Sequence, residues 1–272
     1  MQFKTVTRLN ARNEWTLLGI GGYDINRLNT DLKNPDDHQK YLLDWLPESR
    51  QWSYTLGTTF KHYGNNWYHF FVLSRSGLYN KVEKYTGNDR HNPKTIDYRS
   101  GESENKFRFE HHRYAANGFK LQVGAGIEYA HYDNTTARRL FTAGEAIDQY
   151  YSRALNMWKW AVFGQVSRSF FSERLALSLG LRADGCNYTG KTAALYRQIS
   201  PRFSFSYAFD ERWSLNGNIG RYYQLPAYTT LGFADAGGVL VNKRNKTGYI
   251  GADHYVLGVE YRPGTTTRIT LG

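Results

Sequence analysis

Apolar and polar residues alternate with a period of two along this chain, and this pattern constrains the fold more than any other feature. Every second residue is aromatic in 203–209 and leucine in 175–181. The segments 121–129 and 255–261 repeat the same alternation. A period of two is typical of a β-strand with one apolar face. The segments run to about ten residues, longer than most strands of soluble proteins and long enough for a tilted strand to cross a bilayer.

The connections between these segments are alternately short and long. Short turns are predicted at 10–13, 63–66, 116–118, 172–174, 210–212 and 263–265. Longer polar stretches, interpreted as loops, lie at 24–50, 81–101, 133–155, 189–197 and 224–252. Short turns on one side and long loops on the other are typical of outer-membrane β-barrels. The prediction is therefore an all-β, antiparallel up-and-down transmembrane β-barrel, an incomplete section of about 11–12 strands in which sequence neighbours pair.

The positions of the tryptophans match the membrane interfaces expected at both ends of such strands. Six of the seven stand where a predicted strand begins, three after a short turn and three after a long polar stretch. Aromatic residues gather at both interfaces of membrane barrels. A soluble two-sheet sandwich with these residues in its core is the alternative; it explains the alternation but not the rule of short and long connections. The predicted interface girdle consists of Trp15, Trp52, Trp67, Trp158, Trp160, Trp213 and Tyr223.

Charge and motifs exclude several other functions. The net charge is +11, but the basic residues are scattered without a block of like charges, so no nucleic-acid partner is expected. The single cysteine, Cys186, excludes an internal disulfide. No motif for a metal, a cofactor or a catalytic centre is present. The adjacent His111 and His112 should point to opposite faces of a strand, where they cannot share a metal ion.

The segment 213–224 indicates where a ligand would be held. It starts at a short turn, so it runs outward, and Pro226 marks where the wall ends, because proline cannot donate to a sheet ladder. Tyr222 and Gln224 share the parity of the polar, lumen-facing residues. Loops on a rigid scaffold commonly carry binding. The candidate ligand-binding residues are Tyr222, Gln224 and Tyr228 and, as weaker candidates in the stretch 133–155, Tyr151 and Arg153.

The run "ISPRFSFSY…FDERWSL…GRYYQLP" resembles the barrel of TonB-dependent outer-membrane receptors. The resemblance is good over 156–272 and looser over 1–155. It implies an energy-coupled importer of a scarce nutrient in the outer membrane of a Gram-negative bacterium, with a barrel of about 22 strands around a plug domain. The plug, the signal peptide and the closing strand have no counterpart here, so 1–272 is interpreted as one barrel segment without a plug.

The resemblance also implies the partners. Outer-membrane lipid and lipopolysaccharide would surround the barrel, and the ligand would be a small-molecule or oligomeric nutrient whose identity the sequence does not specify. TonB would act only through the plug. A basic cluster at 242–246 suits an anionic ligand or outer-leaflet phosphates, although a solvated loop tip is the simpler interpretation.

Three other functions remain open from the residues alone. Twelve strands with a polar lumen would suit a passive outer-membrane channel. A barrel hydrolase would need a serine and a histidine placed together on adjacent strands. A binding module would suit the soluble sandwich.

We predict that an isolated 1–272 chain does not close into a stable barrel. Its outermost strands, near 3–9 and 253–262, would lack partners, and open edges are not tolerated in lipid. The measurement is gel migration of heated and unheated samples in detergent. Heat-modifiable migration of a monomer would contradict the prediction and favour the twelve-stranded channel.

Overall fold

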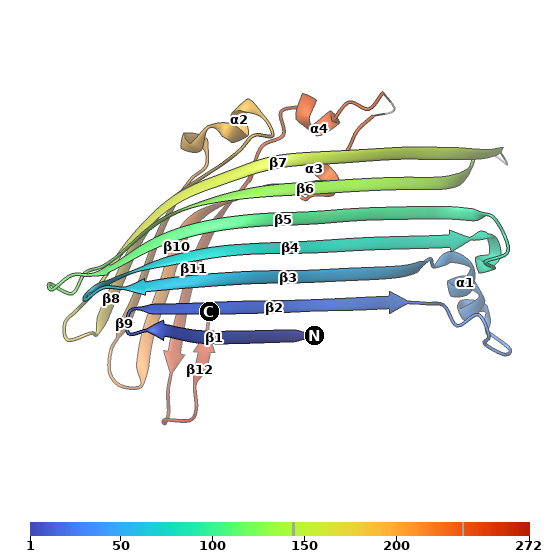
Figure 1. The fold of residues 1–272 in the computed structure, drawn as a ribbon. Coiled ribbons are helices and arrows are strands. Elements are labelled where there is room, and N and C mark those ends of the chain that lie inside the picture. Colours follow the sequence, from blue (N-terminus) through green and yellow to red (C-terminus); the bar gives the residue numbers. More distant parts are fainter. Residues whose placement is uncertain (143–144, 236) are drawn as a thin grey trace.

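The computed structural model describes residues 1–142, 145–235 and 237–272. Its strands form a single antiparallel sheet in sequence order, β1 to β12 (Figure 1). This order confirms the up-and-down arrangement, and the single sheet excludes the two-sheet sandwich. The strands are β1 (Gln2–Asn10), β2 (Asn13–Asn26), β3 (Glu48–Tyr63), β4 (Trp67–Tyr85), β5 (Lys94–Tyr114), β6 (Lys120–Thr142), β7 (Glu145–Phe170), β8 (Leu175–Cys186), β9 (Ile199–Ala208), β10 (Trp213–Gln224), β11 (Ile250–Tyr261) and β12 (Ile269–Leu271).

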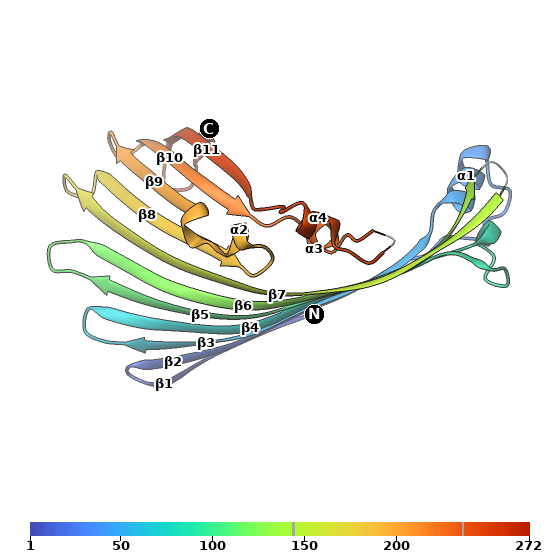
Figure 2. The same ribbon diagram turned by 90° about the horizontal axis from the view of Figure 1, so that it is seen from above.

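The sheet bends into an open trough. Figure 2 shows the helices of the connections between β8 and β9 and between β10 and β11 on its concave side. Within the described residues, β1 pairs only with β2 and β12 only with β11, so the trough is a section of a barrel, as predicted. None of the helices described is long and apolar enough to cross a membrane. They are α1 (Asp37–Trp45), α2 (Gly190–Ala193), α3 (Tyr228–Leu231) and α4 (Val241–Arg244), with 3-10 turns η1 (Thr86–Asn88) and η2 (Leu195–Arg197).

All six predicted short turns separate paired strands, but two predicted loops are wrong. The stretches 81–101 and 133–155 are largely strand, because β4 to β7 extend to 19, 21, 23 and 26 residues. Cross-strand ion pairs stabilise these polar extensions; Arg139 Nε lies 2.7 Å from Asp148 Oδ1. A segment that is polar on both faces lacks the alternation by which strands are recognised, so its sequence predicts a loop.

The two faces of the sheet differ in chemistry. On the convex side, hereafter the outer face, a row of directly paired residues crosses β3 to β7: Leu56, Arg75, Asn105, Tyr129 and Trp158. Toward the short turns, the next outer-face residues are apolar and exposed, including Leu73, Phe107 and Ile127. Toward the long extensions, outer-face residues are mostly polar. The row therefore marks the upper edge of an apolar band, as in a barrel that spans a membrane.

The six tryptophans of the strands lie on this outer face, whereas Trp45 is the last residue of α1. Trp158 and Trp160 stand well inside β7 rather than at its start, because the strand continues beyond the apolar band. Trp158 packs on Tyr129 with ring centroids 5.0 Å apart, and Trp213 stacks on Tyr261 at 4.3 Å. We propose that the tryptophans named above, with Tyr223, form the two interface girdles.

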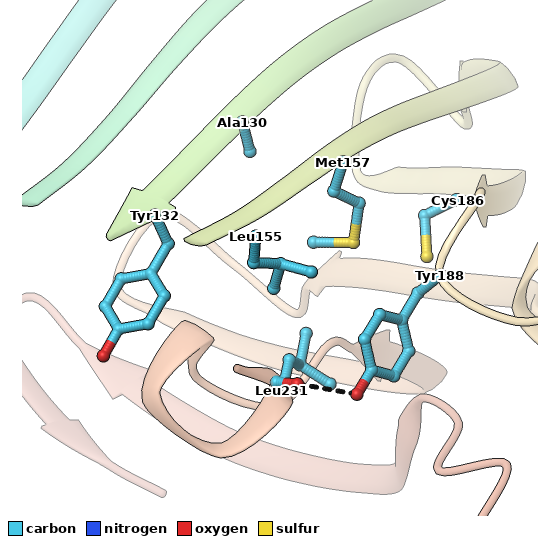
Figure 3. Close-up of a cluster of buried hydrophobic side chains, with 7 residues drawn as sticks. All are labelled: Ala130, Tyr132, Leu155, Met157, Cys186, Tyr188 and Leu231. Atoms are coloured by element: carbon cyan, nitrogen blue, oxygen red, sulfur yellow. Dashed lines mark hydrogen bonds between the residues drawn. The ribbon is translucent and has the colours of Figure 1, made fainter. Parts of the chain in front are cut away.

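The connection between β10 and β11, residues 225–249, folds into the concave side and packs on the wall. Figure 3 shows Leu231 of this inner loop against Leu155 and Met157 of β7 and near Tyr188. Leu231 is 0% exposed, and its carbonyl accepts a hydrogen bond of 2.7 Å from the Tyr188 hydroxyl. The small, buried Cys186 belongs to the same cluster. Apolar packing thus fixes the inner loop across the lumen.

We predict that Leu231→Ala loosens the inner loop. Removal of a fully buried leucine side chain costs about 2–5 kcal/mol. In the folded protein, trypsin should cleave at Lys243, Arg244 or Lys246 at least about tenfold faster in the variant than in the parent. Val239→Ala, an exposed position of the same loop, is the control and should leave cleavage unchanged. Equal cleavage of the parent and Leu231→Ala would show that this packing does not hold the loop.

Candidate ligand-binding site

Four charged side chains meet on the concave side, hereafter the inner face, of β5, β6 and β7. Lys106, Glu128 and Lys159 are direct partners in the ladder, and Glu104 stands two residues from Lys106. Lys106 Nζ lies 2.6 Å from Glu104 Oε2, and Lys159 Nζ lies 3.1 Å from Glu104 Oε1. Lys159 also pairs with Glu128. Each charge has opposite charges beside it, which offsets the cost of removing it from water.

Tyr228 joins this network from the opposite side of the lumen. It is the first residue of α3, in the inner loop that Leu231 anchors. Its hydroxyl donates to Glu104 and accepts a hydrogen bond of 2.6 Å from Lys159 Nζ. Burial, and next the Glu104 carboxylate, raise the pKa of the Tyr228 phenol above its usual value of 10.0, so it acts as a neutral donor. The inner loop is therefore held by one apolar and one polar contact.

A cavity of about 670 Å³ lies between the wall and the inner loop. This volume is in the range of small-molecule sites. Acidic and basic side chains are balanced along its walls, so it suits a polar ligand with both donors and acceptors rather than a purely anionic one. Its charged lining is Glu102, Glu104, Lys106, Arg108, Glu128, Lys159, Arg182 and Asp184, and the loop side contributes Gln224, Pro226 and Tyr228.

The structure brings together some of the predicted ligand-binding residues and separates others. Gln224 and Tyr228 both line the cavity. Tyr222 lies on the inner face beside it, with its ring 4.8 Å from that of His254 and beneath the Arg202 guanidinium. Tyr222 is not part of the cavity wall described here.

The two weaker candidates lie in strand β7, not in a loop, which corrects the prediction for 133–155. Arg153 donates to the carbonyl of Asp235 at 3.2 Å, so it contacts the inner loop rather than the cavity. Tyr151 lies two residues farther out, opposite Thr136, and is 37% exposed.

Sequence reasoning missed the wall residues of this site. Glu104, Glu128 and Lys159 have the parity of the polar face, and a charged residue in a membrane strand is tolerated when it faces the interior. The alternation of the sequence therefore indicates that these residues face the interior. It does not indicate that they pair with one another, because their pairing depends on the register between β5, β6 and β7.

Metal binding has no support in the part of the chain that the structure describes, where no three suitable side chains converge. The predicted separation of the adjacent histidines is confirmed. His112 Nε2 lies 2.6 Å from Glu110 Oε2 on the inner face, while the ring of His111 packs 5.0 Å from that of His69 on the outer face.

We predict that Tyr228 stays protonated well above pH 10.0 in the folded protein. A phenol with a raised pKa contributes its stabilisation fully below the unfolded pKa of 10.0 and loses it as the pH rises through the folded value. The measurement is the tyrosinate absorbance difference between the parent and Tyr228→Phe during an alkaline titration. A midpoint at or below pH 10.0 would contradict the buried contact with Glu104.

Comparison with known proteins agrees with this architecture. The family described as "TonB dependent receptor-like, beta-barrel" matches residues 3–271. A comparison with curated protein sequences found no match. The chain is similar in fold to the ferric enterobactin receptor PfeA of Pseudomonas aeruginosa in its G324V mutant, at 15% identity and a TM-score of 0.64 over 95% of this chain and 39% of that one.

Two further solved structures share the fold. The outer-membrane transporter YddB of Escherichia coli is 14% identical with a TM-score of 0.60, covering 96% of this chain and 37% of YddB. FpvA of P. aeruginosa, bound to a heterologous pyoverdine, is 11% identical with a TM-score of 0.60, covering 95% and 38%. The chain thus spans well under half the length of the receptors it resembles. By the family match over residues 3–271, it belongs to the TonB-dependent receptors, as a section of their outer-membrane β-barrel.

Proposed function

We propose that this chain forms part of the barrel wall of an outer-membrane receptor that binds a scarce nutrient and imports it by TonB-coupled transport. Family membership supports a receptor or transporter rather than an enzyme. The printed descriptions of similar structures, a ferric enterobactin receptor and FpvA with a pyoverdine, support a small-molecule ligand. In this proposal residues 1–272 are one barrel segment, and TonB acts through a plug domain outside them.

One observation carries the proposed position of the ligand. The inner loop reaches across the concave side, and Tyr228 contacts Glu104 and Lys159 on the wall, which leaves the cavity beneath. A ligand in this cavity would meet the Tyr228 hydroxyl and the Lys159 ammonium. These two groups contact each other, and each also contacts Glu104. The Tyr228 hydroxyl and the Lys159 ammonium can turn from each other to a bound polar molecule without becoming unpaired.

The candidate residues take different roles in this proposal. Gln224 and Tyr228 contact the ligand directly, and Tyr222 extends the same inner face toward β9. Arg153 positions the inner loop through Asp235. Tyr151 belongs to the outer rim, where a ligand would first arrive. The balanced charge of the lining supports a polar ligand with hydrogen-bond donors and acceptors.

The passive twelve-stranded channel has less support. A closed channel of this size requires the first and last strands to pair, and among the described residues β1 and β12 each pair with one neighbour. The inner loop also lies across the lumen that a channel would keep open.

The test uses the full-length receptor, with ligand binding and uptake measured on cells. Tyr222→Ala combined with Gln224→Ala, and separately Tyr228→Phe, should weaken binding by about tenfold, since each removes at least one hydrogen bond to a polar ligand. Deletion of 234–247 should reduce uptake further by removing the loop.

The matched control carries Gln149→Ala with Tyr150→Ala, the same residue types on an exposed part of β7. It should bind and import as the parent does. If the Tyr222/Gln224 variant, Tyr228→Phe and the deletion all reach the outer membrane and also behave as the parent, the cavity is not the ligand site.

A further inference from the structure

A second cavity, of about 590 Å³, lies beside the first on the inner face of the sheet. We call it the side cavity. Its volume is in the range of small-molecule sites. Glu102 and Glu104 line both cavities, so the two adjoin at these residues. The inner-face side chains of β2, β3 and β4 that line the side cavity are Ile20, Gln51, Ser53, Thr55, Ser76 and Leu78.

The side cavity differs from the first cavity in the sign of its charge. Acidic and basic side chains are balanced around the first cavity, whereas none of the described residues that line the side cavity is basic. Its charged residues are the two glutamates, Glu102 and Glu104. Because walls that carry one sign of charge concentrate ions of the other sign, the side cavity favours a cationic group.

One of the two glutamates is already paired with cations. Glu104 lies 2.6 Å from Lys106 Nζ and 3.1 Å from Lys159 Nζ. It also accepts a hydrogen bond from the Tyr228 hydroxyl. These three donors all line the first cavity, so Glu104 is neutralised from that side.

The other glutamate has no such partner. Among the described residues, no group forms a hydrogen bond or an ion pair with the Glu102 carboxylate. Its direct partners in the ladder are Leu78 and the buried Tyr132, and Glu104 stands about 7 Å away along the strand. Burial, and next the Glu104 carboxylate, raise the pKa of Glu102. A cation that arrives with a ligand would therefore stabilise this carboxylate more than one that is already paired.

The remaining walls of the side cavity suit an uncharged chain rather than a ring. Ser53 stands directly opposite Leu78, so a hydroxyl group lies beside apolar surface, and Thr55 stands opposite Ser76. Of the described residues that line the side cavity, Tyr54 is the one aromatic residue, and it has the parity of the outer face. A sugar would find no ring to stack on. Hydroxyl groups beside apolar surface match a chain of amide bonds with alkyl side chains.

We propose that the side cavity selects a ligand that carries an ammonium group on an uncharged chain of amide bonds, as a lysine-containing peptide does. The ammonium binds Glu102, and the amide groups form hydrogen bonds with Gln51, Ser53 and Thr55. This inference rests on the proposed function, since it names the class of nutrient that the two adjoining lumen cavities receive.

The experiment measures binding of three probes to the purified full-length receptor in detergent. They are a lysine tripeptide, acetyl-Ala-Lys-Ala-amide, the same peptide with norleucine in place of lysine, and a glucosamine trimer. Norleucine keeps the alkyl chain and removes the charge. The parent should bind the lysine peptide at least about tenfold tighter than either other probe. Equal binding of the norleucine peptide or of the glucosamine trimer would overturn the proposal.

Two variants separate the parts of the side cavity. Glu102→Gln removes the charge but keeps the shape, so the two peptides should bind within about twofold of each other. Ser53→Ala with Thr55→Val should weaken both peptides about tenfold and leave their ratio unchanged, since it removes two hydroxyl groups. An unchanged preference in Glu102→Gln, or unchanged binding of both peptides in the double variant, would overturn the proposal.

The control is Asp44→Asn, which removes an exposed carboxylate from α1, outside both cavities. It should keep the preference for the lysine peptide, and its loss there would attribute the preference to net charge and overturn the proposal. The proposed function is judged separately by nutrient uptake in Tyr228→Phe. If uptake depends on Tyr228 but the parent does not prefer the lysine peptide, only the present inference fails. If the preference is found but uptake does not depend on Tyr228, the side cavity recognises cations and the first cavity is not the nutrient site.

Discussion

Backbone pairing along one continuous antiparallel ladder is the constraint on which the rest of this structure depends. A strand in lipid cannot leave its N–H and C=O groups unpaired, so each strand pairs with its sequence neighbour. The register of that ladder then assigns every side chain to a face. A slip of one residue between β5 and β6 would turn Glu128 toward lipid and Ile127 toward the lumen.

The two faces tolerate polar groups for different reasons. On the inner face, Glu104, Glu128 and Lys159 are paired and away from lipid, and the inner loop covers them. Leu231 supplies the apolar anchor that brings Tyr228 to those charges. The position of the inner loop and the charges of the wall are therefore coupled. The packing of Leu231 and the hydrogen bonds of Tyr228 are both needed to bury a phenol beside the Glu104 carboxylate.

On the outer face, the long polar region lies beyond the row that ends the apolar band. There the strands continue as a sheet with water on both sides, stabilised by cross-strand ion pairs and stacked aromatic rings. The same regular register places Arg50, Lys81 and Arg99 in one row, where like charges repel. The register of a single sheet therefore places charged groups on both of its faces.

The sequence by itself determined the strand alternation, the six short turns, the neighbour pairing and the lumen parity of Tyr222 and Gln224. It did so because alternation and turn residues are local properties. Only the tertiary structure decided the length of β4 to β7, the inward fold of the inner loop and the meeting of Tyr228 with Glu104. Residues that far apart come together through register and long-range packing, and polar strands outside the membrane lack the alternation that identifies a strand.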